Sequence, residues 1–246
     1  MWCSSIWDRP RRARWDSSQD ETETEGRGRF ARKRAAKDAP RQRSLRPLRM
    51  VWQAGTGYPG HVALALVALF ITAAALIQAS HSVYCGFGTL NWKAQGYSET
   101  VIGFLWAEGV IAEIILFAFG AHLVRRLGPA KLILLGGVAG AVRWSVTGTA
   151  GGLGVLIIMQ ALHAFTFAAT HLGAIYFISR RVPQAVSASA QSLYSAVVMG
   201  LALGLAMLAS GNLYSLYGAG AYQAMAVMAA LGSIVAVFIL RRRATE

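Results

Sequence analysis

Six long apolar stretches follow one another between residues 61 and 240, and they constrain the fold of this chain more than any other feature. They cover residues 61–84, about 100–123, 131–148, 152–178, about 188–214 and about 219–240. A helix needs ~20 residues to cross the ~30 Å hydrocarbon core of a bilayer. The sequence therefore predicts an all-α, polytopic membrane protein with six transmembrane helices.

Charged residues are concentrated outside these stretches. Residues 1–60 hold 14 of the 24 Lys and Arg and 7 of the 11 Asp and Glu, whereas residues 60–240 hold only ten charged side chains. So polar a segment buries too little apolar surface to offset its ordering entropy. We expect a disordered, basic cytoplasmic tail at 1–58 and a six-helix transmembrane domain at 59–243. The bilayer, and no nucleic acid, is the expected partner; contact of residues 27–49 with lipid headgroups or nucleic acid is the alternative.

Basic residues also gather on one side of the predicted bundle. The loops after the second and fourth stretches are basic at 125–131 and 180–181, and the C-terminus is basic at 241–243. The loops on the opposite side hold one cation, Lys93. Because Lys and Arg are retained on the cytoplasmic side, we expect a multi-pass protein of the cell (inner) membrane with both termini in the cytoplasm.

Apart from Lys131 at the start of the third stretch, three charged side chains lie inside the second and third stretches. Charged groups in a bilayer normally face a cavity or each other. At ~1.5 Å per residue, Glu108 lies roughly 12 Å, Glu113 roughly 20 Å and Arg143 roughly 12 Å below the outer face. We expect Arg143 to pair with one of these carboxylates. The pair either orients helices permanently or breaks when a substrate or proton arrives.

The fourth stretch carries a polar face. At about 100° per residue, four polar side chains fall within an arc of roughly 100°. They are Gln160, His163, Thr170 and His171. Histidine titrates near neutral pH, which suits a proton site; hydrogen-bonded packing is the alternative. His81 and Tyr84, at the end of the first stretch, are further candidates. A metal would need a third ligand at fixed geometry, so we expect no metal and no cofactor.

Glycines in two stretches favour a tightly packed bundle. The third stretch contains Gly136, Gly137 and Gly140, and the fifth contains Gly200 and Gly204 at a spacing that allows close helix approach. The sequence has no Gly-rich phosphate loop, nucleophile elbow or HExxH motif. We therefore expect neither an enzyme nor an ATP-driven pump.

Residues 121–131 resemble the short cytoplasmic signature loop of the major facilitator superfamily, G-x-L-x-D-R-x-G-R-R. Leu123, Arg126 and Gly128 match that motif, while Ala121 and Arg125 depart from it. Three further segments, at 80–98, 106–144 and 160–173, look like the seventh to tenth helices of its phenylpropionate-permease branch. The residues that carry this likeness are Ser80, His81, Tyr84, Gly86, Phe87, Trp92, 96–98, Trp106, Glu113, 142–144, 160–167 and 171–173.

The resemblance covers about residues 62–243 and implies a secondary active transporter. Such a protein would carry a small organic solute with a proton by alternating access, and an aromatic acid such as phenylpropionate would suit Arg143 as counter-ion. The expected substrate or proton pathway is Glu108, Glu113, Arg143, Gln160, His163, His171, His81 and Tyr84.

The match is to one six-helix half of a twelve-helix family whose site lies between two halves. Activity would then need a second copy or a separate N-terminal half. The alternative is a non-transporting six-helix membrane subunit or a truncated inactive fragment.

Overall fold

The computed structural model describes residues 60–149 and 152–243, and within these ranges it contains helices and no strand. Five candidate membrane spans are long and apolar enough to cross a bilayer. They are Leu66–Ala94, Glu99–Ala118, Pro129–Thr147, Leu153–Arg181 and Gln184–Arg241. An all-α polytopic membrane protein is thereby confirmed. The predicted tail at 1–58 lies outside the described residues.

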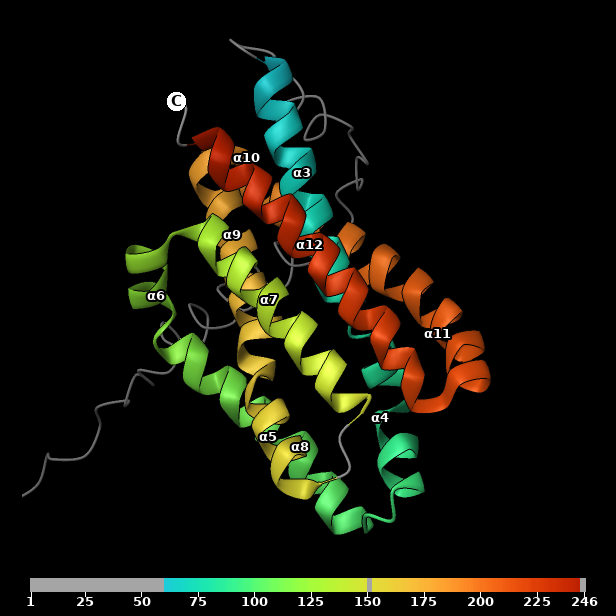
Figure 1. The fold of residues 1–246 in the computed structure, drawn as a ribbon. Coiled ribbons are helices and arrows are strands. Elements are labelled where there is room, and N and C mark those ends of the chain that lie inside the picture. The colour runs from blue at the N-terminus through green and yellow to red at the C-terminus, as the bar shows by residue number, and fades with distance from the viewer. Residues whose placement is uncertain (1–59, 150–151, 244–246) are drawn as a thin grey trace, which may run out of the picture. The chain divides into compact units, whose positions relative to one another are not determined.

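The last candidate span contains two helical rods rather than one. The chain turns at η3 (Gly218–Gly220), where Gly218 has a positive φ of 55° that favours glycine. The turn joins α11 (Leu203–Tyr217) to α12 (Ala221–Arg243), which run back past each other in Figure 1. Five continuous spans thus give six rods, which agrees approximately with the predicted six helices.

The first predicted helix is interrupted and longer than expected. α3 (Gly60–Ala79) ends before Ser80, and α4 (Ser82–Ala94) continues past the predicted end at residue 84. The Ser80 hydroxyl donates to Ile77 O at 2.6 Å, and His81 Nδ1 lies 3.1 Å from the same carbonyl. Side chains that bond nearby carbonyls compete with the helical ladder, which accounts for the break.

The second predicted helix is also divided. α5 (Glu99–Ala118) is capped at its N-terminus by Ser98, whose hydroxyl accepts from Val101 N. It is followed by the short α6 (Gly120–Leu127), so most of the predicted signature loop is helical. Gly128 then turns the chain into α7 (Pro129–Thr147) with a φ of 75°, a conformation that favours glycine.

Two later helices contain π-helical segments that hydrophobic spacing does not predict. η1 (Ala164–Ala169) lies between α8 (Leu153–Ala161) and α9 (Thr170–Arg181). η2 (Ser195–Ala202) lies between α10 (Gln184–Tyr194) and α11. A π-helix bonds residue i to i+5, so its turn is wider than that of an α-helix, and such segments are frequent at functional sites.

α7 lies at the centre of the bundle. It packs against α12, α9 and η1, while α12 also packs on α3, and α5 packs on α8 and η1 (Figure 1). Gly136 and Gly137 permit this packing. A Cβ at Gly136 would collide with Thr170, and a Cβ at Gly137 would collide with Ser233. Gly204 has open space around its Cβ position. The expected helix approach at this glycine of α11 is therefore absent from the described part of the chain.

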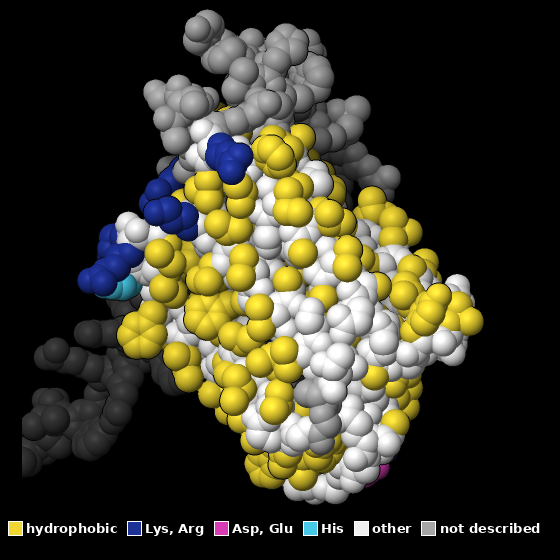
Figure 2. Space-filling model, viewed as in Figure 1, with side chains coloured by type: hydrophobic (Ala, Val, Ile, Leu, Met, Phe, Trp, Pro, Cys, Tyr) yellow, Lys and Arg dark blue, Asp and Glu magenta, His cyan; other side chains and the backbone are white. Residues whose placement is uncertain are grey.

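The surface is apolar over much of the bundle and basic at one edge. Figure 2 shows hydrophobic side chains across most of one face, with Lys and Arg gathered near α6 and the ends of α9 and α12. Phe104, Ile114 and Leu208 are more than half exposed, at 71%, 62% and 77%. Large exposed apolar areas mark interaction or membrane surfaces, as expected for a lipid-facing bundle.

Candidate functional site

A fully buried arginine forms the centre of the polar interior. Arg143 lies on α7 and has no exposed surface. Its Nη2 donates to Gln160 Oε1 at 2.8 Å, and its Nη1 donates to His163 Nδ1 at 2.7 Å and to Thr166 Oγ1 at 3.1 Å. All three partners come from the helix that runs from α8 into η1. Within the described residues Arg143 forms no salt bridge with a carboxylate, so the predicted direct ion pair is absent.

Aromatic rings complete the surroundings of this cation. The guanidinium carbon lies 4.3 Å from the ring centroid of Trp144 and 4.6 Å from that of Tyr84. A cation over a ring face is attracted by the ring quadrupole, and more strongly when both are desolvated. Arg143 Nε has no hydrogen-bond partner in the described chain. Neutral groups and ring faces therefore hold the positive charge.

His163 connects Arg143 to Glu113. A guanidinium only donates hydrogen bonds, so His163 Nδ1 accepts and the ring proton resides on Nε2. Nε2 lies 2.6 Å from Oε1 of Glu113 on α5. The arginine and one predicted carboxylate partner are thus joined through an imidazole.

Gln160 ties four helices together. Its Oε1 accepts from Arg143 on α7, and its Nε2 donates to the hydroxyl of Tyr84 on α4 at 2.9 Å and to the carbonyl of Leu105 on α5 at 2.8 Å. Each polar atom of this amide has a partner, which is what a buried amide requires. Gln160 therefore fixes the position of the guanidinium relative to α4 and α5.

His81 joins the network from the break between α3 and α4. Its Nδ1 lies 3.1 and 3.2 Å from the carbonyls of Ile77 and Gln78, which only accept, so Nδ1 carries the proton. In its neutral form Nε2 then accepts from the Thr166 hydroxyl, 3.1 Å away. His81 and His163 thus have opposite tautomers on either side of Thr166.

Three contributors to this network are absent from the pathway predicted by sequence. Thr166 accepts from Arg143, and the Trp144 ring covers the cation. Trp144 Nε1 donates to Ser80 Oγ at 2.9 Å, which anchors that ring to the α3–α4 break. Thr166 follows His163 by three positions and so shares its helix face. Ser80 is among the residues that carry the family likeness, but no helix spacing predicts its contact with Trp144.

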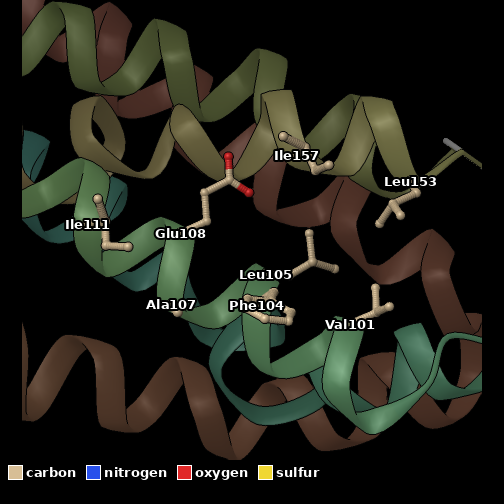
Figure 3. A pocket seen from close by; sticks show the side chains of 8 residues that line it. All are labelled: Val101, Phe104, Leu105, Ala107, Glu108, Ile111, Leu153 and Ile157. Atoms are coloured by element: carbon tan, nitrogen blue, oxygen red, sulfur yellow. The ribbon is translucent and has the colours of Figure 1, made fainter.

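Glu108 lies apart from the network. It lines an apolar groove of about 360 Å³ between α5 and α8, together with Phe104, Ile111, Leu153 and Ile157 among others. Figure 3 shows its carboxylate directed from α5 toward the helix that carries Ile157. No hydrogen bond or ion pair of Glu108 is formed with the described residues.

Of the other predicted residues, His171 lies beside the network and the signature loop lies away from it. The His171 ring stacks on Phe167 with a centroid separation of 6.4 Å. Leu123 packs at the apolar cluster around Leu116 and Val124, and Arg126 is exposed. The structure therefore brings together six of the eight predicted pathway residues: His81, Tyr84, Glu113, Arg143, Gln160 and His163.

Comparison with known proteins finds the same family that the sequence motifs resemble. The model of the MFS_1 like family matches residues 15–224, starting earlier than the likeness found from about residue 62. A protein of Escherichia coli (strain K12), described as a probable 3-phenylpropionic acid transporter, is 38% identical over 160 residues. That alignment covers 65% of this chain and 42% of the relative.

A second relative is more distant. The uncharacterized transporter YwbF of Bacillus subtilis (strain 168) is 26% identical over 119 residues, covering 48% of this chain and 30% of the relative. The chain thus spans less than half the length of both relatives. The family match covers most of the chain and agrees with the apolar helices. This multi-pass membrane protein belongs to the major facilitator superfamily, in a phenylpropionate-permease-like family.

Proposed function

We propose that this chain forms the solute-binding half of a secondary active transporter that carries a small organic acid together with a proton. The buried Arg143 guanidinium carries this proposal. A buried cation normally has a counter-ion, but the described hydrogen-bond partners of Arg143 are all neutral, and Glu113 is joined to it only through His163. A carboxylate solute would supply the missing negative charge.

We infer proton coupling from two successive contacts, Arg143 with His163 and His163 with Glu113. While Arg143 donates to His163 Nδ1, that nitrogen cannot take a second proton. A solute carboxylate bound to Arg143 would offer its guanidinium a better acceptor and free Nδ1. Glu113, in contact with Nε2 at 2.6 Å, would stabilise the resulting imidazolium. Uptake of one anion with one proton leaves the net charge of the site unchanged.

Aromatic side chains favour an aryl acid as the solute. Tyr84 and Trp144 lie over the guanidinium, and Trp106 packs on Tyr84 with ring centroids 4.5 Å apart. Aromatic pairs contribute about 0.5–1.5 kcal/mol beyond area burial. A solute with a ring next to its carboxylate would find both kinds of partner. The relative described as a probable 3-phenylpropionic acid transporter supports phenylpropionate as the first solute to test.

Alternating access requires a second bundle that moves against this one, with the site between them. The partner in this proposal is a second copy of the chain or a separately provided N-terminal half. We further propose the inner membrane as the location, with both termini and the Leu123, Arg126 and Gly128 turn on the cytoplasmic side. The basic edge in Figure 2 supports this orientation.

A non-transporting membrane subunit or an inactive fragment is the alternative. The hydrogen bonds of Arg143 to Gln160, His163 and Thr166 favour it, because neutral partners can also hold an arginine permanently in place. The two functions differ in one measurable property: only a transporter moves the solute across a membrane when a proton gradient is imposed.

Binding and transport are tested separately on the purified chain. Titration calorimetry in detergent should detect 3-phenylpropionate binding that Arg143→Gln weakens at least about tenfold, or ~1.4 kcal/mol. Arg125→Gln, at an exposed position on α6, is the control. Proteoliposomes with an inward proton gradient should then accumulate labelled 3-phenylpropionate. Absence of both binding and uptake for this and other organic acids would favour the non-transporting subunit.

A further inference from the structure

Two imidazoles and a phenyl ring form a column along the fourth long helix. The rings of His163 and Phe167 are 5.5 Å apart at 25°, and those of Phe167 and His171 are 6.4 Å apart at 11°. In an α-helix, residues four apart are offset by roughly 40°. The wider turn of η1 reduces that offset, so residues 163, 167 and 171 align on one side.

Phe167 separates the two imidazoles chemically. Its ring has no group that can accept or donate a proton, so His163 and His171 cannot exchange one directly. Glu113 on α5 is linked to both imidazoles: its carboxylate contacts His163 Nε2 at 2.6 Å and interacts electrostatically with His171. Among the described residues it is the charged group that interacts with both histidines.

The far side of His171 contains polar atoms without partners. His171 Nδ1, Tyr194 OH and Gln78 Oε1 are buried and form no hydrogen bond in the described chain. The rings of His171 and Tyr194 are 5.9 Å apart, and Gln78 interacts with Tyr194. An unsatisfied buried polar group costs about 1–3 kcal/mol. Other buried atoms of the described chain also have no partner, but these three come from α9, α10 and α3 and gather around one imidazole.

We propose that His171, Tyr194 and Gln78 form a second proton station, and that Glu113 carries the proton between His163 and this station. The inference rests on the proposed proton-coupled transport. The His163 imidazolium gives its Nε2 proton to the Glu113 carboxylate, which leaves a neutral imidazole and a neutral carboxyl. That carboxyl gives the proton to His171, which restores the carboxylate and forms an imidazolium. The Tyr194 hydroxyl and the Gln78 carbonyl oxygen accept from the imidazolium. Half-buried His171 then releases the proton to water and returns to its neutral form.

The location of the station gives the transfer a direction. His171 precedes the exposed Arg180 and Arg181 at the end of α9, and Tyr194 lies on α10, directly beyond that turn. The station is therefore nearer the basic edge of the bundle than His163 is. Three elements contribute groups near His171. Glu113 on α5 is the ionisable group that interacts with it, the ring of Tyr194 on α10 packs beside it, and α3 contributes the neutral Gln78, which interacts with Tyr194. Arg143 on α7 interacts with Glu113.

The test compares net uptake of labelled 3-phenylpropionate into empty proteoliposomes with its exchange into proteoliposomes preloaded with unlabelled solute. Net uptake driven by a proton gradient requires proton release at the station, whereas solute exchange at equal pH does not. We expect His171→Asn to lower net uptake at least about tenfold while exchange stays within about twofold of wild type. Tyr194→Phe keeps the ring and should shift the pH profile of net uptake with normal exchange. His122→Asn, exposed on α6, is the matched control.

The outcomes separate this inference from the function on which it rests. Wild-type uptake with an unaltered His171→Asn variant overturns the second station and leaves the transporter intact. Loss of exchange in both His171→Asn and Tyr194→Phe gives these residues a structural role and also overturns the station. A wild-type chain that shows neither uptake nor exchange, alone or reconstituted with a separate N-terminal half, overturns the transport function, and the station with it.

Discussion

Arg143 Nη1 and His163 Nδ1 lie 2.7 Å apart, and this contact decides where the imidazole can hold a proton. The guanidinium has no acceptor atom, so Nδ1 contributes its lone pair and Nε2 carries the hydrogen toward Glu113. A second proton on Nδ1 would set two donors against each other. His163 therefore becomes an imidazolium only after Arg143 moves or receives another acceptor.

Replacement of Arg143 by lysine keeps the charge and removes the planar fork. The guanidinium reaches Gln160 Oε1 through Nη2 and His163 Nδ1 through Nη1 at once. An ammonium is a point charge that cannot reproduce this paired geometry. We expect Arg143→Lys to weaken 3-phenylpropionate binding at least about tenfold by calorimetry. Arg125→Lys is the control, and equal affinity of Arg143→Lys and wild type would show that charge alone suffices.

An internal carboxylate at residue 166 should compete with the solute. Thr166 Oγ1 lies 3.1 Å from Arg143 Nη1 and 3.1 Å from His81 Nε2. Thr166→Asp would place a negative charge beside the cation, and a buried pair at this distance is strongly attractive. We expect uptake and binding of an organic anion to fall about tenfold or more.

The matched variant at this position is Thr166→Val, which has nearly the same shape and no charge. It removes one acceptor from a multiply bonded arginine, so a smaller loss of about threefold is expected. If Thr166→Val lowers affinity as much as Thr166→Asp, the loss comes from the missing hydroxyl rather than from charge competition. Binding calorimetry on both variants decides between the two causes.

Glutamine at position 113 imitates the protonated carboxyl. Its carbonyl oxygen can still accept from His163 Nε2, which lies 2.6 Å from Glu113 Oε1. It cannot release a proton, so the variant should bind and exchange solute but lose accumulation under a proton gradient. Exchange within about twofold of wild type and at least tenfold lower accumulation are expected. Normal accumulation by Glu113→Gln would remove this residue from the proton path.

Depth estimates from the sequence put Glu108 level with Arg143 and Glu113 deeper, but they do not give the directions of these side chains. Glu108 and Glu113 are five positions apart, so their Cα atoms are about 140° apart around an α-helix. Both point toward the helix that carries Ile157 and His163, but only Glu113 contacts His163, whereas Glu108 lines the apolar groove beside Ile157. The imidazole between Arg143 and Glu113 was not predicted, because sequence separation does not specify what lies between two side chains.

Apolar spacing predicts the membrane rods well and their internal irregularities poorly. Lipid imposes hydrophobicity along a whole span, so the rods are visible in the sequence. The π-helical segments η1 and η2 change hydrogen-bond register without changing hydrophobicity. The break at Ser80 and His81 depends on side-chain bonds to the carbonyls of residues 77 and 78. Such local competition is not apparent from hydropathy.

Glycine spacing alone does not show which glycines lie at a close helix contact. The glycines of α7 and α9 do, Gly204 does not, and this difference allows a test of the packing between α7 and α9. A Cβ at Gly173 would lie 2.9 Å from the carbonyl oxygen of Pro129 and 3.0 Å from Ile133 Cγ1. A backbone oxygen cannot move aside easily, so Gly173→Ala should destabilise the fold by about 1–3 kcal/mol. Gly204→Ala is the control, because nothing lies within 4 Å of its Cβ position.

Thermal unfolding in detergent measures both glycine variants. Gly204→Ala should leave the melting temperature unchanged or raise it, because alanine is favoured over glycine in a helix by about 1 kcal/mol. Gly173→Ala should melt several degrees lower, consistent with its larger free-energy loss. Equal melting temperatures would mean that α7 and α9 separate without loss of stability. The contacts of α7 that place Arg143 against the η1 segment would then not depend on this close approach.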